Sequence, residues 1–296
     1  MSCTLVAIAD PETGPLDAAL VAGLASSFDT EARWLAASEA AEMAIVGHDP
    51  ASIRARAFEL AAGLSAPVDL ALLPPGPRRK RLLISDMDST MITVECIDEL
   101  ADFAGVKAEV AAITRRAMNG ELDFAGALAE RVALLAGLPA EVIDEVYRDR
   151  VRAMPGARIL VQTMRRWGAV TALVSGGFVP FAERVAHDLG FETVVANRLE
   201  VVRGHLTGRV LPPITGSQAK LSTLTQLMRS HELRPDETLA VGDGANDLPM
   251  IEAAGLGVAF RPHRILADAS DVVIRTADLT ALLYLQGVPK AEFFVK

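Results

Sequence analysis

Short apolar runs and amphipathic stretches alternate over the first quarter of the chain. Strands are predicted near residues 3–9, 32–37, 42–47 and 67–73, and helices near 16–27 and 50–63. Strand, helix, strand, strand, helix, strand is the order of a ferredoxin-like α+β domain. The proline-rich segment 73–77 that follows favours extended backbone and predicts a short, stiff linker. We therefore expect an N-terminal domain at residues 1–74.

The rest of the chain, residues 75–296, alternates apolar runs with helical patterns. An apolar run at 82–84 predicts a strand, and residues 95–150 have apolar side chains at helical spacing, which predicts helices. Further strands are expected near 170–174, 192–196, 239–242, 257–260 and 272–274. This alternation is typical of a parallel α/β sheet. The polar segment 201–208 predicts a hairpin with glycine at its turn.

Two carboxylates, Asp86 and Asp88 of the segment DMDST, directly follow the strand predicted at 82–84. Ligands of open parallel sheets bind beyond the carboxyl ends of the strands, so both side chains should reach one pocket. An ionised aspartate can attack phosphorus and form an aspartyl phosphate, while a second carboxyl protonates the leaving oxygen and later accepts a proton from water. The alternative is that both acids cap a helix or form a turn, where aspartate is common.

Two later segments could hold an anion. Ser175, Gly176 and Gly177 follow the strand predicted at 170–174. Such a loop can offer backbone N–H groups and a hydroxyl to a phosphate, or it can be an ordinary glycine turn. Lys220 opens a helical pattern after a loop with proline and glycine. Its ammonium could neutralise phosphate charge as a point charge, although most single lysines are solvated surface groups.

A third segment, VGDGANDLPM, ends another strand in polar side chains. Mg²⁺ prefers oxygen ligands and keeps several waters, so one or two carboxylates from separate strands are sufficient. We expect Asp243 to share the cation with Asp86, Asp247 to hold metal-bound water, and Asn246 to reach the phosphate or the substrate. In the structural alternative the two acids only cap the next helix.

Taken in order, DMDST, VSGGF (174–178), Lys220 and VGDGANDLPM (241–250) resemble the haloacid dehalogenase superfamily of phosphotransferases. Glu95, the pair Phe124 and Arg131, and the string ANRL (196–199) look like the phosphoserine phosphatases of that superfamily. The resemblance covers roughly residues 80–290, and its motifs are highly specific in combination.

The resemblance implies a fold as well. It implies a Rossmann-like parallel α/β core at residues 78–94 and 152–296, with a helical cap at about 95–151 inserted after the first strand. A cap of this kind can exclude water during phosphoryl transfer. The N-terminal domain is similar to the amino-acid-binding, ACT-type regulatory domains that some of these enzymes carry. The alternative is a packing or dimerisation module without a ligand, because fold does not imply function.

The same resemblance implies Mg²⁺-dependent hydrolysis of O-phospho-L-serine, the last step of serine biosynthesis, through an aspartyl phosphate. Asp86 would be the nucleophile and a Mg²⁺ ligand through its side chain. Asp88 would be the general acid and base and would give the metal its main-chain carbonyl. Asp243 would complete the protein ligands.

Further roles follow for the groups around the substrate. The implied binding set is Ser175, Gly176 and Lys220 for the phosphate with Asn246 nearby, Glu95 for the ammonium, Arg131 for the carboxylate, Phe124 and Met118 for an apolar wall, and Gly177 and Asp247 in support. From the residues alone, a zwitterion needs one anionic and one cationic contact, and arginine is the usual fork for a carboxylate. The alternative is that Glu95 and Arg131 are solvated helix residues.

Two other functions stay open at this point. The chain could be a phosphatase or phosphotransferase for another small phosphorylated metabolite, such as phosphohomoserine. It could also be a non-catalytic amino-acid sensor, although a pure binding module would not need the acids Asp86, Asp88, Asp243 and Asp247.

Composition and charge exclude further classes. A formal net charge of −9 and a pI near 5.1 argue against a nucleic-acid surface, and we interpret the basic cluster 78–81 as a solvated boundary. Cys3 and Cys96 predict no disulfide framework, which fits a reducing cytoplasm. Neither a signal peptide nor an apolar stretch of about 18 residues is present, so we expect a cytoplasmic enzyme without a membrane partner. The sequence is compatible with a homodimer but does not decide it.

Overall fold

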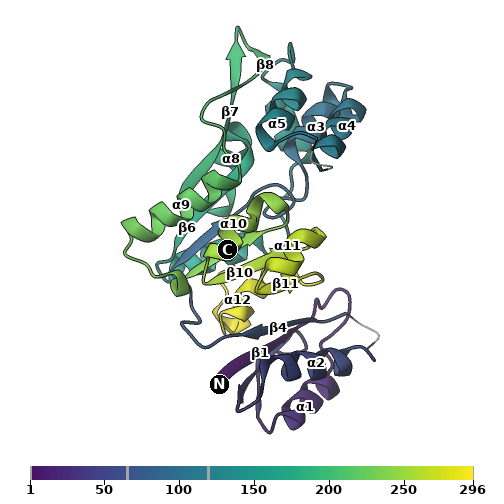
Figure 1. Ribbon diagram of the computed structural model, residues 1–296, viewed down its shortest axis with the longest axis vertical. Helices are drawn as coiled ribbons and strands as arrows, with labels where there is room; N and C mark the ends of the chain where they lie inside the picture. Colours follow the sequence, from purple (N-terminus) through teal and green to yellow (C-terminus); the bar gives the residue numbers. More distant parts are fainter. Residues whose placement is uncertain (1, 65–66, 119–120, 296) are drawn as a thin grey trace.

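The strands of this protein form two separate sheets in the computed structural model, which describes residues 2–64, 67–118 and 121–295. A four-stranded sheet lies at one end of the molecule, and a seven-stranded sheet forms its middle (Figure 1). A group of helices lies at the opposite end from the smaller sheet, beside the hairpin β7–β8 (Figure 1).

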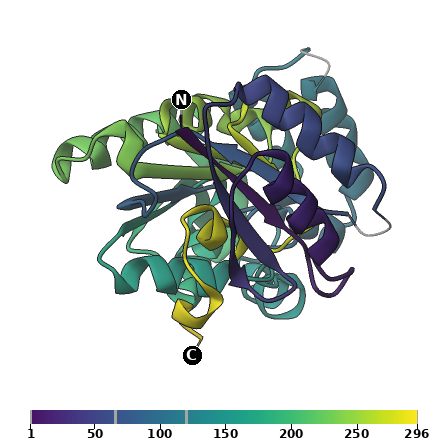
Figure 2. The ribbon, with the colours of Figure 1, turned by 90° about the horizontal axis from the view of Figure 1, so that it is seen from below.

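The smaller sheet is antiparallel, and two helices cover one of its faces. Its elements are β1 (Ser2–Ile8), α1 (Ala18–Ser27), β2 (Ala32–Ala36), β3 (Ala40–Val46), α2 (Pro50–Ala61) and β4 (Asp69–Leu73). The strand order is β2-β3-β1-β4, and all neighbours run antiparallel. Figures 1 and 2 show α1 and α2 on the face that points away from the larger sheet. The predicted succession of strands and helices is therefore present.

Local sequence explains both the helix starts and the two faces of this sheet. Asp17 and Asp49 cap α1 and α2, and each carboxylate accepts a backbone N–H of the first turn. Successive strand residues point to opposite faces. In β1, Leu5 therefore packs under the helices, whereas Val6 and Ile8 belong to the core that continues into the larger unit.

The larger sheet is parallel except at one edge. Its strands are β5 (Leu82–Ser85), β6 (Val170–Phe178), β7 (Thr193–Val202), β8 (His205–Leu211), β9 (Thr238–Gly242), β10 (Leu256–Phe260) and β11 (Val272–Ile274). They lie in the order β11-β10-β9-β5-β6-β7-β8. All neighbours are parallel except β7 and β8, which form the predicted hairpin with Arg203 and Gly204 at its turn. The sheet is therefore mixed: its core is parallel, as expected, and the predicted hairpin adds one antiparallel strand at the edge.

Helices and single turns connect and cover these strands. They are α7 (Ala157–Arg166), α8 (Val179–Leu189), α9 (Ser217–Ser230), α10 (Leu248–Ala253), α11 (Arg264–Ala269) and α12 (Ala281–Leu285), with 3₁₀ turns η1 (Pro235–Glu237), η2 (Ala245–Asp247) and η3 (Lys290–Glu292). Strand β6 runs four residues beyond the expected 174, and its register with β7 shifts between Val174 and Phe178. The loop expected at Ser175–Gly177 is thus an irregular end of the strand.

A helical insertion separates β5 from the rest of the sheet. It consists of α3 (Cys96–Phe103), α4 (Lys107–Met118), α5 (Phe124–Ala133) and α6 (Val142–Arg150). Its segment 137–140 pairs with the tip of the hairpin β7–β8 through three backbone hydrogen bonds of 2.8–2.9 Å, between Gly137 and Leu206, Leu206 and Leu138, and Ala140 and Gly204. The insertion is therefore attached to the sheet at two places, through its chain connections and through the hairpin.

A buried carboxylate joins the smaller sheet to the larger unit. Asp69, at the start of β4, is 6% exposed and accepts four hydrogen bonds of 2.9–3.1 Å. The donors are the backbone N–H groups of Arg275, Thr276 and Ala277 and the hydroxyl of Thr276. Because every donor comes from the segment after β11, this carboxylate fixes the edge of one sheet to the edge of the other.

The linker between the two sheets is not the solvated boundary that the basic cluster suggested. Lys80 is 7% exposed, and its ammonium donates to the Asp236 carbonyl at 2.8 Å. The Arg78 guanidinium bonds Glu42 on β3 and the carbonyl of Leu285 in α12. The interpretation is wrong for these two residues. Arg78 lies where the chain passes between the two units and bonds both of them, whereas Lys80 is buried against the larger unit.

Within the described ranges, no helix is long and apolar enough to cross a bilayer.

Candidate active site

Three neighbouring strands place the predicted catalytic segments side by side. The central strands lie in the order β9-β5-β6, all parallel, so their carboxyl ends meet at one edge. Asp86 follows β5, Asp243 follows β9, and Ser175 lies in the irregular end of β6. The backbone N–H of Asp86 donates to the Val241 carbonyl at 3.1 Å, which extends the pairing of β5 and β9 to the first acid.

Lys220 is buried between two carboxylates. It lies in the first turn of α9, its side chain is 0% exposed, and its ammonium is 2.7 Å from an Asp86 oxygen and 2.5 Å from an Asp247 oxygen. Burial by itself lowers the pKa of this lysine, but the two carboxylates outweigh burial and raise the pKa above its ordinary value. Lys220 is therefore a permanent cation next to the predicted nucleophile, and not the solvated lysine of the alternative.

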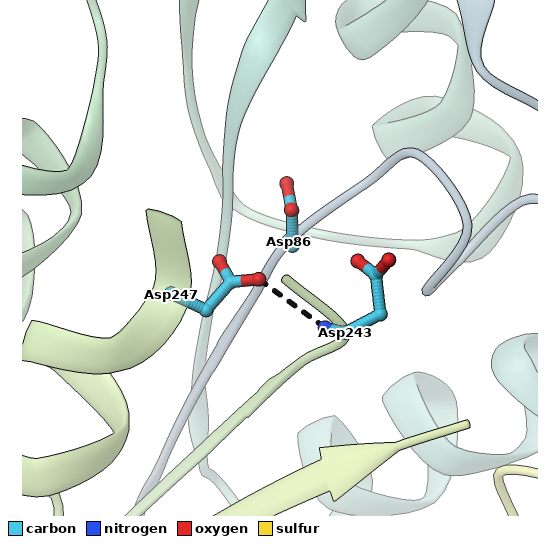
Figure 3. A group of neighbouring side chains, drawn as sticks. All are labelled: Asp86, Asp243 and Asp247. Atoms are coloured by element: carbon cyan, nitrogen blue, oxygen red, sulfur yellow. Dashed lines mark hydrogen bonds between the residues drawn. The ribbon is translucent and has the colours of Figure 1, made fainter. Parts of the chain in front are cut away.

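The carboxylates of Asp86, Asp243 and Asp247 are neighbours (Figure 3): Asp86 follows β5, Asp243 follows β9, and Asp247 lies in η2. One oxygen from each lies within 4.8 Å of the others. Burial, followed by the charges of neighbouring carboxylates, raises the pKa of Asp243 to about 8 and that of Asp247 to about 7. So much negative charge in a desolvated site, with oxygen as the only donor type, suits a hard divalent cation such as Mg²⁺.

The two loop acids differ in how their carboxylates are occupied. Both oxygens of Asp247 already accept hydrogen bonds, one from Lys220 and the other from the backbone N–H groups of Asp243 and Gly244. Among the described residues, the carboxylate of Asp243 accepts only the hydroxyl of Thr90, at 3.2 Å. Asp243 therefore has the most ligand capacity of the three acids. Both oxygens of Asp86 are also engaged, one by Lys220 and the other by the backbone N–H of Met87 at 2.7 Å. Asp247 orders the loop and the lysine.

Asp88 lies beside the phosphate-loop candidates. Its carboxylate accepts the backbone N–H of Cys96 at 3.1 Å and the hydroxyl of Ser175 at 3.5 Å. Burial, followed by the charge of Glu95, raises the pKa of Asp88 well above its ordinary value. A Cβ atom at Gly177 would lie 2.6 Å from an Asp88 oxygen, so only glycine fits there, and its N–H donates to Ser175 at 2.8 Å. An acid held in this way can carry a proton near neutral pH.

Charged groups at the mouth of the site come from the helical insertion. Glu95 precedes α3 and accepts the Ser89 hydroxyl at 2.6 Å. Its side chain reaches solvent, yet partial burial raises the pKa of Glu95, while the hydrogen bond from Ser89 opposes this. Arg131 is half-buried in α5, and the charges that act on its guanidinium include Asp98, Glu95 and Asp88. The charges of Glu95 and Arg131 therefore act on each other, and both lie within electrostatic range of Asp88.

The other predicted binding residues have different positions. Phe124 opens α5 and packs against Gly176, where a Cβ atom would lie 3.0 Å from its ring. Asn246 lies in η2 and folds back so that its amide oxygen would be 2.6 Å from a Cβ at Gly244. Met118 is the last residue of α4, and its side chain lies outside the described part of the structure.

Ser89 and Thr90 belong to the segment DMDST, but no role was predicted for them from the sequence. The structure shows their hydroxyl groups on Glu95 and Asp243, respectively. Hydroxyl residues directly after a pair of acids were the available signal, because serine and threonine readily donate to nearby carboxylates.

A family model described as haloacid dehalogenase-like hydrolase matches residues 83–252, which run from β5 into α10 and include all the acids above. The chain belongs to the haloacid dehalogenase-like hydrolase family. Its strand order and its helical insertion after β5 are thus the framework of a hydrolase of this family.

Curated relatives within the family are phosphoserine phosphatases. The chain is 46% identical over 215 residues to phosphoserine phosphatase SerB2 of Mycobacterium tuberculosis, a match that covers 73% of this chain and 52% of that protein. It is 41% identical over 245 residues to a phosphoserine phosphatase of Archaeoglobus fulgidus, covering 83% of this chain and 71% of the relative. The chain thus spans about half the length of the first relative.

The whole chain also has a structural counterpart. The unliganded crystal structure of a probable phosphoserine phosphatase from Vibrio cholerae superposes with a TM-score of 0.78 at 30% identity, covering 98% of this chain and 88% of that one. The similarity therefore includes both sheets and is not confined to the hydrolase core.

Proposed function

We propose that this haloacid dehalogenase-like hydrolase is a Mg²⁺-dependent phosphoserine phosphatase, which releases L-serine and phosphate in the last step of serine biosynthesis. The single observation that carries the proposal is the position of Lys220, buried 2.7 Å from the Asp86 carboxylate at the carboxyl edge of the sheet. A permanent cation beside a nucleophilic carboxylate suits a phosphate group that must approach that carboxylate. The names of the relatives support the choice of substrate.

The reaction would proceed in two steps on the protein's own groups. The Asp86 carboxylate oxygen forms a bond to phosphorus as the bond from phosphorus to the serine oxygen breaks, and Asp88 gives its proton to that oxygen. Asp88 then accepts a proton from water, the water oxygen bonds to phosphorus, and the acyl phosphate bond breaks. The raised pKa of Asp88 supports the first role, because the carboxyl must start protonated.

The acid cluster fits a magnesium ion. Asp86 and Asp243 would hold it with their side chains and Asp88 with its main-chain carbonyl, and the bound ion would neutralise phosphate charge. Ser175, Gly176 and Lys220 would hold the phosphate, with Asn246 nearby. Asp247 would keep Lys220 in place through its 2.5 Å contact, and Gly177 would leave room for Asp88.

Recognition of serine would come from the helical insertion. Glu95 would pair with the ammonium and Arg131 with the carboxylate, while Phe124 and Met118 would close the apolar wall. We assign the insertion, at about 95–151, the role of a cap that excludes water during phosphoryl transfer. Its attachment to the hairpin β7–β8 supports this role, because those contacts hold the insertion over the carboxyl edge of the sheet.

The N-terminal unit would be an ACT-like domain at residues 1–74, next to the phosphatase domain at 75–296. Its strand order and antiparallel pairing support this assignment. Serine inhibition kinetics on the full chain test whether it binds serine. Competitive inhibition alone would place serine only in the catalytic pocket, whereas a non-competitive component would support a second site.

A phosphate-release assay tests the proposed function. O-phosphoserine is compared with phosphoglycolate and phosphohomoserine, with and without Mg²⁺, and with homoserine as an acceptor. We expect turnover of O-phosphoserine that depends on Mg²⁺ and is lost in Asp86→Asn. A clear preference for another phosphate ester would refute the substrate. Full activity of Asp86→Asn would refute the nucleophile, and no release of phosphate under any condition would favour an amino-acid sensor.

A further inference from the structure

Asn197, in β7, is a fully buried polar side chain that joins two loops. It is 0% exposed and belongs to the string ANRL, to which the sequence analysis gave no role. Its amide nitrogen donates to the carbonyl of Gly176 at 2.8 Å and to that of Thr215 at 3.0 Å, and its oxygen accepts the N–H of Thr215 at 2.7 Å. Both donors and one acceptor position of the amide are therefore used.

This side chain replaces main-chain pairing where the sheet is irregular. The register of β6 and β7 shifts between Val174 and Phe178, so the Gly176 carbonyl lies outside the regular ladder. A partly buried carbonyl outside the ladder needs another donor, and Asn197 supplies it. The same amide extends the connection to the segment before α9, which belongs to neither strand.

The two loops that Asn197 joins carry the groups proposed to hold phosphate. Gly176 is next to Ser175 at the end of β6. Thr215 precedes Gly216, whose carbonyl accepts the backbone N–H of Lys220 at 3.3 Å in the first turn of α9. Asn197 therefore connects the hydroxyl and N–H side of the proposed phosphate site to its ammonium side, through the backbone groups of Gly176 and Thr215.

Phe124 of the helical insertion lies against the same two loops. A Cβ atom at Gly176 would be 3.0 Å from its ring, and a Cβ atom at Gly216 would also be 3.0 Å from it. The aromatic ring thus fills the space that two missing side chains leave. Asn197 bonds Gly176 and Thr215, the neighbour of Gly216. The distance between the two glycines sets the width of the gap that the ring fills, which we call the seat of Phe124.

We propose that Asn197 is a positioning residue that sets the distance between the Gly176 loop and the start of α9, and thereby both the phosphate site and the seat of Phe124. The proposal rests on the proposed function for the assignment of these loops to phosphate. Every group through which Asn197 would act is a backbone group, so its effect passes through loop position and not through direct contact with substrate.

Inorganic phosphate, titrated in Mg²⁺ buffer and followed by calorimetry, is the probe for the first test. We expect Asn197→Ala to weaken phosphate affinity at least tenfold. The matched control is Gln286→Ala, because Gln286 is also a buried amide, with an N–H donated to Leu282 and an oxygen that accepts from Lys80. The control should lower Tm to a similar extent and leave phosphate affinity unchanged, which separates positioning from general destabilisation.

A double-mutant cycle on kcat/KM for p-nitrophenyl phosphate tests the seat of Phe124. If both residues act through the same loops, Phe124→Ala should lower kcat/KM by a smaller factor in the Asn197→Ala enzyme than in the unaltered enzyme. Asn197→Ser, which keeps one donor, serves if the alanine variant does not fold, and it should show an intermediate loss. Unchanged phosphate affinity in the asparagine variants, or independent effects in the cycle, would overturn the proposal. Failure of the proposed function would appear instead as no hydrolysis of O-phosphoserine by the unaltered enzyme, since neither probe here is phosphoserine.

Discussion

Replacing Lys220 by methionine tests the electrostatic design of the site. Methionine keeps much of the length of the side chain but leaves Asp86 and Asp247 without the cation that now lies 2.7 and 2.5 Å from them. Breaking a buried ion pair by removing one partner costs about 3–5 kcal/mol. For a domain of this size each kcal/mol shifts Tm by roughly 2–4 °C, so we expect Tm to fall by roughly 6–20 °C at pH 8.

The sign of the pH dependence is part of this prediction. Burial and the charge of Asp86 raise the pKa of Asp247 to about 7 although Lys220 opposes this, so without the lysine that pKa rises further above its unfolded value near 4. A carboxylate with a raised folded pKa stabilises the protein at low pH, and this stability is lost as the pH rises through the folded value. The deficit of Lys220→Met in Tm should therefore be larger at pH 8 than at pH 5.5. Turnover should fall by about 10²–10³-fold, the usual effect of removing one preorganised group that stabilises transition-state charge.

Differential scanning calorimetry and the phosphate-release assay measure both effects, and the chain offers a matched control. Lys80 is also buried, but its ammonium donates to the Asp236 carbonyl at the opposite end of β5 from Asp86. Lys80→Met leaves one carbonyl without its donor, which costs about 1–3 kcal/mol, and it should leave kcat unchanged. A Lys220→Met enzyme with ordinary turnover, or with the same deficit in Tm at both pH values, would refute the reasoning.

Three further predictions concern the substrate, the metal and the joint between the sheets. Glu95→Gln should raise KM for O-phosphoserine and O-phosphoethanolamine about tenfold and leave phosphoglycolate, which has no ammonium, unaffected; equal effects on all three would remove Glu95 from ammonium binding. Asp243 and Asp247 have raised pKa values of about 8 and 7, so the folded state is stabilised while they are protonated. In EDTA, Tm should therefore fall as the pH rises from 5 to 8 and both acids ionise. Added Mg²⁺ binds the ionised acids, so it should raise Tm more at pH 8.5 than at pH 5.5. Equal increases would count against the metal site. Asp69→Ala leaves three backbone N–H groups without an acceptor. The free energy of unfolding in urea should fall by about 3 kcal/mol or more, while the kcat of the folded protein stays the same. A lower kcat would instead connect the joint between the sheets to catalysis.

The strands, the helices and the chemistry at the strand ends followed from local sequence. Apolar runs of strand length and helical periodicity are short-range signals, and they predicted both sheets and the helical segment after β5. Because parallel strands present their carboxyl ends at one edge, the sequence alone predicts that the acids at 86 and 243 share one site. The resemblance in the motifs added the roles of individual residues.

The tertiary structure decided which polar groups lose water and which meet a partner. Nothing in the local sequence distinguishes Lys80 and Arg78 from their solvated neighbours. Lys80 loses water by packing against the larger unit, and Arg78 finds its partners where the two units meet. In the same way, Asn197 carries no local signal, because its three partners lie 18 and 21 residues away in the chain. Sequence patterns record what each segment prefers by itself, whereas desolvation, pKa shifts and hydrogen bonds between loops depend on segments that only folding brings together.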